Sequence, residues 1–63
     1  MEWEFSSGGY LKVYSDTKVA WFNIDGLKIR IAWQEGVFTP ADWNKTLVCV
    51  KEAKKILRRI RKI

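Results

Sequence analysis

The stretch around Thr39 divides the chain into two segments with different hydrophobic periods. Before it, apolar and polar residues alternate, as they do in β-strands with one buried face. After it, the apolar residues that follow helical spacing are Trp43, Leu47, Val50, Ala53, Leu57 and Ile60. Thr39 is a suitable N-cap, Pro40 suits the first helical position, and Asp42 has the spacing of a capping box. The sequence therefore predicts strands before Thr39 and one long helix after it.

Turn signals divide the strand segment into four parts. Residues 6–9 contain two glycines, residues 15–18 favour a turn, and Asp25-Gly26 is typical of a type I′ hairpin turn. The strands predicted between these turns cover residues 2–5, 10–14, 19–24 and 27–33. We therefore expect an α+β fold in a single domain over residues 1–63, with a four-stranded antiparallel sheet followed by one long C-terminal helix.

The small size of the chain favours a dimer. A domain of 63 residues lies near the lower limit for a self-sufficient core, and such domains usually need disulfides, a metal or a partner chain. Cys49 is the only cysteine and there is no histidine, so we expect neither an intrachain disulfide nor a thiolate zinc site. A helix that continues to the C-terminus spans roughly 35 Å at about 1.5 Å per residue, which is long for the predicted strands. We therefore expect a homodimer in which part of the helix packs against a second copy.

The residue types exclude several classes of function. The chain lacks histidine, a glycine-rich phosphate loop, and a serine or cysteine beside a plausible base, so we do not expect an enzyme. We also expect no metal, no cofactor and no small-molecule substrate. There is no run of about 18 apolar residues that would span a membrane, and the acidic N-terminus lacks the apolar core of a signal peptide. With one free cysteine, these features predict an intracellular protein, in the cytoplasm or nucleoid, or in the nucleus of a eukaryote.

Positive charge is concentrated at the end of the chain. The formal net charge is +5, and residues 51–63 hold seven of the 12 basic side chains with a single acid. The basic residues expected to make auxiliary phosphate contacts are Lys54, Lys55, Arg58, Arg59, Arg61 and Lys62. A solvated helix face, or a docking surface for an acidic protein, would explain the same charges.

Alternation assigns the strand residues to two faces of the sheet. The face expected to form the core under the helix contains Leu11, Val13, Ala20, Phe22, Ile24, Leu27, Ile29, Ile31 and Trp33. The opposite face contains Tyr10, Lys12, Tyr14, Trp21, Asn23, Lys28 and Arg30. Aromatic rings that stack on bases, together with cations that follow phosphates, are the parts of single-stranded nucleic-acid sites. A competing interpretation is that these aromatic residues form cross-strand pairs on a solvated sheet face.

Three segments of the sequence are similar to motifs of a known family. They are Gly36-Val37-Phe38-Thr39-Pro40-Ala41-Asp42-Trp43, Tyr10-Leu11-Lys12-Val13 and Lys18-Val19. In these segments, and in the order of its elements, the chain resembles the positive cofactor four group of transcriptional coactivators and single-stranded-DNA-binding proteins. The resemblance implies a homodimer with packed helices and single-stranded DNA across the strands, on the face away from the helices. It also implies that Lys18 takes the place of a basic residue at the start of the family's third strand.

The chain departs from that family in several features, one of which is an Asp25-Gly26 hairpin tighter than the family's usual connection. Before the helix, the family has a basic, glycine-containing stretch where this chain has Trp33-Gln34-Glu35-Gly36. The family's serine- and lysine-rich tail has no counterpart in this sequence, and the helix is longer and more basic. Plain DNA binding is therefore favoured over a coactivator role.

Taken together, the residues and the resemblance predict a protein that binds single-stranded DNA. The predicted nucleic-acid-binding residues are Tyr10, Lys12, Tyr14, Lys18, Trp21, Lys28 and Arg30. RNA and duplex DNA remain alternative ligands, and transcription is the process that the resemblance implies. The alternative function is a protein-interaction module, or a subunit of an assembly, that docks an acidic partner through its basic helix. A membrane partner is disfavoured because the sheet needs Trp43 and Leu47 for its own core.

Overall fold

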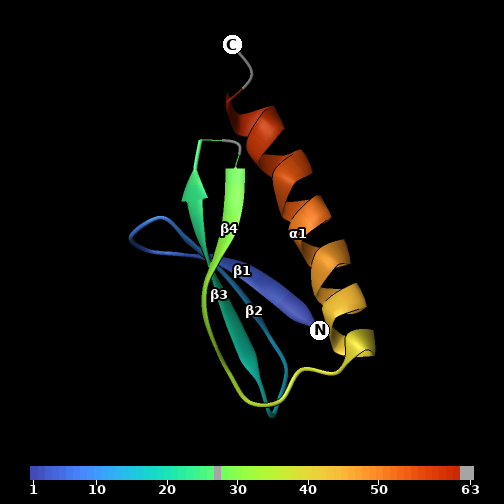
Figure 1. Ribbon diagram of the computed structural model, residues 1–63. Coiled ribbons are helices and arrows are strands. Elements are labelled where there is room, and N and C mark those ends of the chain that lie inside the picture. The colour runs from blue at the N-terminus through green and yellow to red at the C-terminus, as the bar shows by residue number, and fades with distance from the viewer. Residues whose placement is uncertain (27, 62–63) are drawn as a thin grey trace.

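The computed structural model describes residues 1–26 and 28–61, with side chains up to residue 60. Its elements are β1 (Glu2–Ser6), β2 (Tyr10–Tyr14), β3 (Val19–Asp25), β4 (Lys28–Glu35) and α1 (Pro40–Arg61). Within the described residues, the four strands form one antiparallel sheet in the order β1-β2-β3-β4, and α1 follows it in the chain (Figure 1). This arrangement confirms the predicted α+β fold.

Two local motifs fix the start of α1. The Thr39 backbone N–H donates to Asp42 Oδ2 at 2.9 Å, and the Asp42 N–H donates to Thr39 Oγ1 at 3.2 Å, which is the predicted capping box. The ring of Phe38, just before the cap, stacks on Trp43 with centroids 4.5 Å apart, as in a hydrophobic staple. Trp43, which we expected to anchor the helix on the sheet, therefore packs on the connection before the helix.

The connection from β4 to α1 passes very close to the β2–β3 turn. Gly36 has a φ of 87°, and a Cβ at this position would lie 2.7 Å from the Thr17 carbonyl oxygen and 2.9 Å from Lys18 Cβ. Glycine alone permits both the positive φ and the close approach. Gly36 therefore sets the path that brings the helix start next to the β2–β3 turn.

The β3–β4 hairpin lies where Asp25-Gly26 predicts it, with one difference in register. Asp25 pairs with Lys28 and ends β3, so the turn begins at Gly26, whose φ is 65°. Glycine adopts this backbone conformation without steric cost. Leu27, which was assigned to the core face, lies outside the described residues.

A β-bulge in β4 changes the predicted faces of the sheet. Trp21 pairs with Trp33 but Phe22 pairs with Ile31, so Ala32 is an extra residue on β4. The extra residue reverses the alternation beyond it, and Trp33 lies on the side of Trp21. The prediction that Trp33 belongs to the core is therefore wrong.

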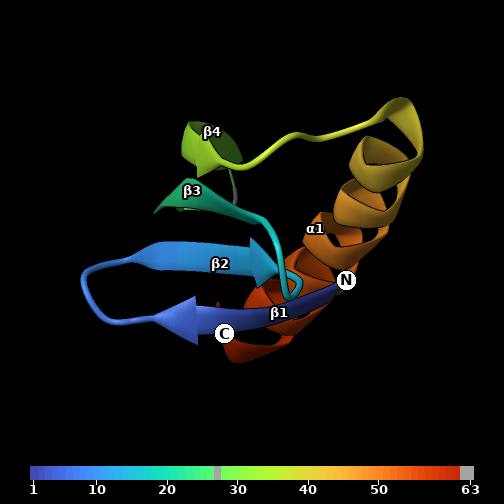
Figure 2. The ribbon, with the colours of Figure 1, turned by 90° about the horizontal axis from the view of Figure 1, so that it is seen from below.

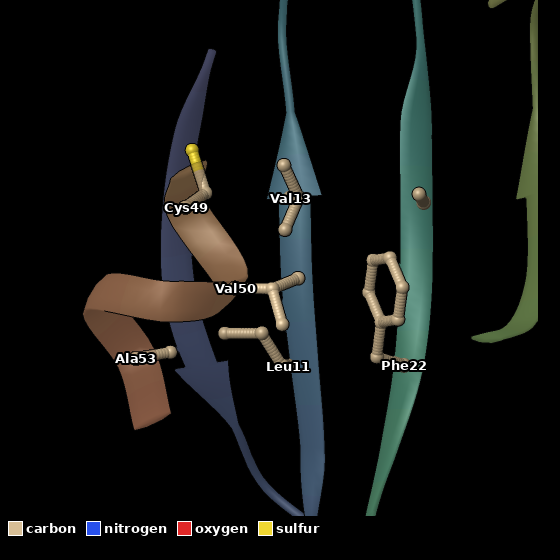
Figure 3. Packing of buried hydrophobic residues seen from close by; sticks show 7 residues of the cluster. Leu11, Val13, Phe22, Cys49, Val50 and Ala53 are labelled. Atoms are coloured by element: carbon tan, nitrogen blue, oxygen red, sulfur yellow. The ribbon is translucent and has the colours of Figure 1, made fainter. Parts of the chain in front are cut away.

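The core lies between α1 and the β1–β2 part of the sheet (Figure 2). Its buried residues are Leu11, Val13, Ala20 and Phe22 from the sheet, and Cys49, Val50 and Ala53 from α1. Val50 lies over Leu11 of β2, with Phe22 of β3 beyond it (Figure 3). Full burial of a side chain such as Leu11 stabilises the fold by about 1.5–3 kcal/mol. The predicted burial of these strand residues is confirmed.

The core-side face of β4 is largely open, because α1 packs on β1 and β2. Ile31 is 49% exposed and Leu47 is 56% exposed. Both were expected in the core of a single chain, and that prediction is wrong because α1 lies over one half of the sheet only. Ile24 and Ile29 are partly buried at the margin of the core.

Candidate nucleic-acid interface

The face of the sheet that points away from α1, called the outer face below, is ordered by the strand register. Across β2, β3 and β4 its three rows are Tyr10, Asn23 and Arg30; Lys12, Trp21 and Trp33; and Tyr14, Val19 and Glu35. On β1, Ser6, Glu4 and Glu2 extend these rows in the same order. The central row contains Trp21 and Trp33, and the rows on its two sides differ in charge.

Three rings, called the aromatic cluster below, contact one another on the outer face. Trp21 and Trp33 stack with centroids 5.3 Å apart and an interplanar angle of 20°. Tyr10 lies edge-on to both, at 6.4 Å from Trp21 and 6.2 Å from Trp33. These are cross-strand contacts, as the competing interpretation expected, yet Trp33 is still 46% exposed. The cluster therefore offers aromatic surface to a ligand.

Lys12 holds a positive charge against these rings. Its Nζ lies 4.8 Å from the Tyr14 centroid, 5.5 Å from the Trp21 centroid and 3.9 Å from Glu4 Oε1. Each exposed cation–π contact is worth about 0.5–1 kcal/mol. Desolvation, followed by the nearby Glu4 and Glu2 carboxylates, raises the pKa of Tyr14, so its phenol stays neutral. Lys12 therefore places a positive charge beside Trp21, at one side of the aromatic cluster.

The outer face has a basic end and an acidic end. Lys28 and Arg30 are exposed near the β3–β4 hairpin, where Asp25 pairs with Lys28. Glu2 and Glu35 are exposed at the other end. Phosphates are attracted to the first end and repelled from the second. A nucleic-acid strand on this face would therefore place its phosphates toward the hairpin.

The structure does not bring Lys18 into this set. Its Nζ lies 2.6 Å from Asp42 Oδ2, and its side chain is only 17% exposed. The hydrogen bond from Lys18, followed by those from Thr39, lowers the pKa of Asp42 to about 2. The ammonium also lies 5.8 Å from the Phe38 ring centroid. Lys18 is therefore engaged in holding the start of α1.

The basic helix residues lie apart from the outer face, because α1 covers the opposite side of the sheet. Lys55, Arg58 and Arg59 are exposed and Lys54 is half-buried. Arg61 closes α1, and Lys62 lies outside the described residues. These residues form a second charged region, distinct from the aromatic cluster.

A hollow of about 480 Å³ adjoins the aromatic cluster at the acidic end of the outer face. Its lining includes Trp21 and Trp33 from the cluster, Lys12 and Tyr14 from β2, and Glu35 from β4. The β2–β3 turn closes one side. The hollow therefore combines aromatic surface with charged groups of both signs.

Trp33 and Glu35 are the two residues of β4 on this face that the sequence did not predict there. Strict alternation assigned Trp33 to the core, and the bulge that reverses the assignment has no glycine or other turn signal in the sequence. In the sequence, Glu35 belongs to the stretch before the helix that lacks the basic residues of the resembled family. A signal for either residue would have required knowledge of the β3–β4 register.

Comparisons with protein-family models, with curated proteins and with solved structures find no match to this chain. Over the part of the chain that the structure describes, no group of three or more potential His, Cys, Asp or Glu ligands is close enough to hold a metal ion. The described length of α1 is not apolar enough to cross a membrane. Burial raises the pKa of the Cys49 thiol, which accords with a packing role.

Proposed function

We propose that this protein binds single-stranded DNA across the outer face of its sheet. The observation that carries the proposal is the aromatic cluster, in which Tyr10, Trp21 and Trp33 contact one another with Trp33 half-exposed. Stacking of a base on a protein ring contributes about 1–3 kcal/mol and tolerates every base, because each has a π-face. Two stacked bases supply much of the affinity of such a site.

Two cations of the same face, Lys28 and Arg30, would hold the phosphates of the bound strand. Lys12 lies over the rings, and Lys28 and Arg30 lie toward the hairpin. Such contacts release counterions, so the affinity falls as salt rises. The carboxylates of Glu2 and Glu35 would repel the phosphate backbone of the bound DNA. This repulsion would give the DNA strand one preferred path across the outer face.

Titration of a labelled oligothymidylate of about 12 nucleotides tests the proposal. Trp33→Ala should weaken binding by roughly five- to a hundredfold, the equivalent of one lost stacking contact. Gln34→Ala is the matched control, since Gln34 is the next residue, is exposed, and pairs with the buried Ala20. Equal affinities of the wild type and Trp33→Ala would contradict binding at this face. Competition with RNA and duplex DNA of the same length ranks the alternative ligands.

A second copy of the chain is the partner that we propose for the open core-side face. Ile31 and Leu47 leave apolar surface in water there, and a domain this small gains stability from a partner. Leu47→Lys should shift the mass measured by sedimentation from dimer to monomer. Val48→Lys is the control, because Val48 is equally exposed on another side of α1. A wild-type monomer at all concentrations would rule the dimer out.

A second candidate function is the docking of an acidic protein on α1. The observation that favours it is the exposure of Lys55, Arg58 and Arg59 on the side of the molecule away from the aromatic cluster. Replacing these three by glutamine should abolish copurification of an acidic partner and leave oligothymidylate binding intact. Loss of oligonucleotide binding instead would make the three residues part of the nucleic-acid site. In either function we place the protein inside the cell, with transcription as the process for DNA binding.

A further inference from the structure

The hollow beside the aromatic cluster differs from a plain stacking surface in its charged groups. Its volume is about 480 Å³, and its lining includes the two tryptophans Trp21 and Trp33 and the charged residues Lys12, Asp16, Lys18 and Glu35. Lys12 lies on β2 and Glu35 on β4, two strand spacings across and one row along the sheet, so their backbones are about 12 Å apart. Long side chains that reach inward from this separation can contact two edges of one planar group between them.

Glu35 determines which hydrogen-bonding groups a planar ligand in the hollow must present. Its carboxylate is exposed and offers only acceptors. Among the described residues, the ion pairs join Lys12 to Glu4 and Lys18 to Asp42, so neither involves Glu35. A phosphate would be repelled from this carboxylate. A neutral ring with adjacent N–H donors would satisfy it with two parallel hydrogen bonds.

We propose that the hollow binds a guanine base of the single strand. The Glu35 carboxylate accepts from guanine N1–H and the N2 amino group, and Lys12 donates to O6 or N7, which are acceptors. The base ring stacks on the neighbouring tryptophan surface. This assignment depends on the proposed single-stranded-DNA binding and adds a base preference to it.

The other bases match this arrangement less well. Thymine has one ring N–H between two carbonyl oxygens, and a carboxylate repels both oxygens. Adenine and cytosine have one amino group beside an unprotonated ring nitrogen. Guanine alone presents two adjacent donors to Glu35 together with acceptors for Lys12.

The experiment compares oligothymidylates that carry a single central guanine, hypoxanthine or adenine. Hypoxanthine keeps N1–H, O6 and N7 and lacks only the N2 amino group. The wild type should bind the guanine oligonucleotide roughly tenfold more tightly than the hypoxanthine one, as expected for one contact of a bidentate pair. Glu35→Gln should reduce this ratio to near one. Asp25→Asn is the matched control, because it removes the same charge from the far end of the outer face and keeps a residue suited to the turn.

The outcomes distinguish failure of the guanine site from failure of single-stranded-DNA binding. A guanine preference that is lost in Glu35→Gln and kept in Asp25→Asn supports the guanine site. Equal binding of the three oligonucleotides by the wild type, or an unchanged preference in Glu35→Gln, overturns the guanine site and leaves binding of single strands in place. Binding of none of the three overturns both proposals. Circular dichroism of each variant verifies that its fold is retained.

Discussion

The Lys18 ammonium lies 2.6 Å from Oδ2 of Asp42, and this contact joins the β2–β3 turn to the first turn of α1. The two side chains are 17% and 19% exposed. The same carboxylate oxygen accepts from the Thr39 backbone N–H and from its hydroxyl. Asp42 is therefore the residue through which the helix start is tied both to its own cap and to the sheet.

The stability of the fold should depend on the ionisation of Asp42 in acid. Its pKa is about 2 in the folded chain, against an ordinary value of 3.8. Because the unfolded state binds the proton more readily, stability from this group is present above about pH 4 and is lost as the pH falls toward 2. Urea unfolding at pH 5 and at pH 2 measures the loss.

Asp42→Asn is the control for this pH dependence. The variant should be less stable than the wild type at pH 5 and should lose less stability between pH 5 and pH 2. If Asp42→Asn and the wild type lost equal stability in acid, another group would be responsible.

Thr39→Ala, which removes the cap hydroxyl, should cost about 1 kcal/mol and lower the melting temperature by about 4–8 °C.

Gly36 should tolerate substitution less well than Gly9. Both have positive φ, 87° and 81°, and alanine in this conformation costs about 1–2 kcal/mol. At Gly9 a Cβ would meet nothing within 4 Å, whereas at Gly36 it would lie 2.7 Å from the Thr17 carbonyl oxygen. We expect Gly36→Ala to destabilise the fold more than Gly9→Ala in urea unfolding. Equal losses would mean that the connection moves away from the turn at little cost.

Leu11 and Leu47 should differ in their contributions to stability, although both were expected to support the core. Leu11 is fully buried and Leu47 is 56% exposed. Leu11→Ala should cost about 2–5 kcal/mol, a large part of the stability of a small domain. Leu47→Ala should cost much less at low protein concentration, where a dimer contributes least. A Leu47→Ala cost that grows with protein concentration would be the signature of a second copy on that face.

The fold could be predicted from the sequence because its main signals are local. Alternation identified the strands, and Thr39 with Asp42 marked the start of α1 by hydrogen bonds that span three residues. The position of α1 on one half of the sheet could not be predicted, since helical spacing identifies an apolar stripe and not the strands that it contacts. The exposure of Ile31 and Leu47 follows from that position alone.

The outer face was predictable only in part, for a similar reason. Tyr10, Lys12 and Trp21 share a face by simple alternation, and the structure places them together. Trp33 joins them through an extra residue at Ala32, and the register that creates it depends on the pairing of two strands. Lys18 does not join them, because its ammonium donates a hydrogen bond to the carboxylate of Asp42, 24 positions later in the chain.

Arg30 and Lys18 should differ in their effects on the salt dependence of oligonucleotide binding. Arg30 is exposed on the outer face in the row of Tyr10, whereas Lys18 is paired with Asp42. Each phosphate contact to a single strand contributes about 0.7 to the slope of log affinity against log salt concentration. Arg30→Gln should therefore reduce the slope by about 0.7 and leave thermal stability nearly unchanged. Lys18→Gln should lower the melting temperature and leave the slope as it is, because an ammonium held by a carboxylate releases no counterion from the strand. A reduced slope in Lys18→Gln would show instead that this lysine exchanges Asp42 for a phosphate when the strand binds.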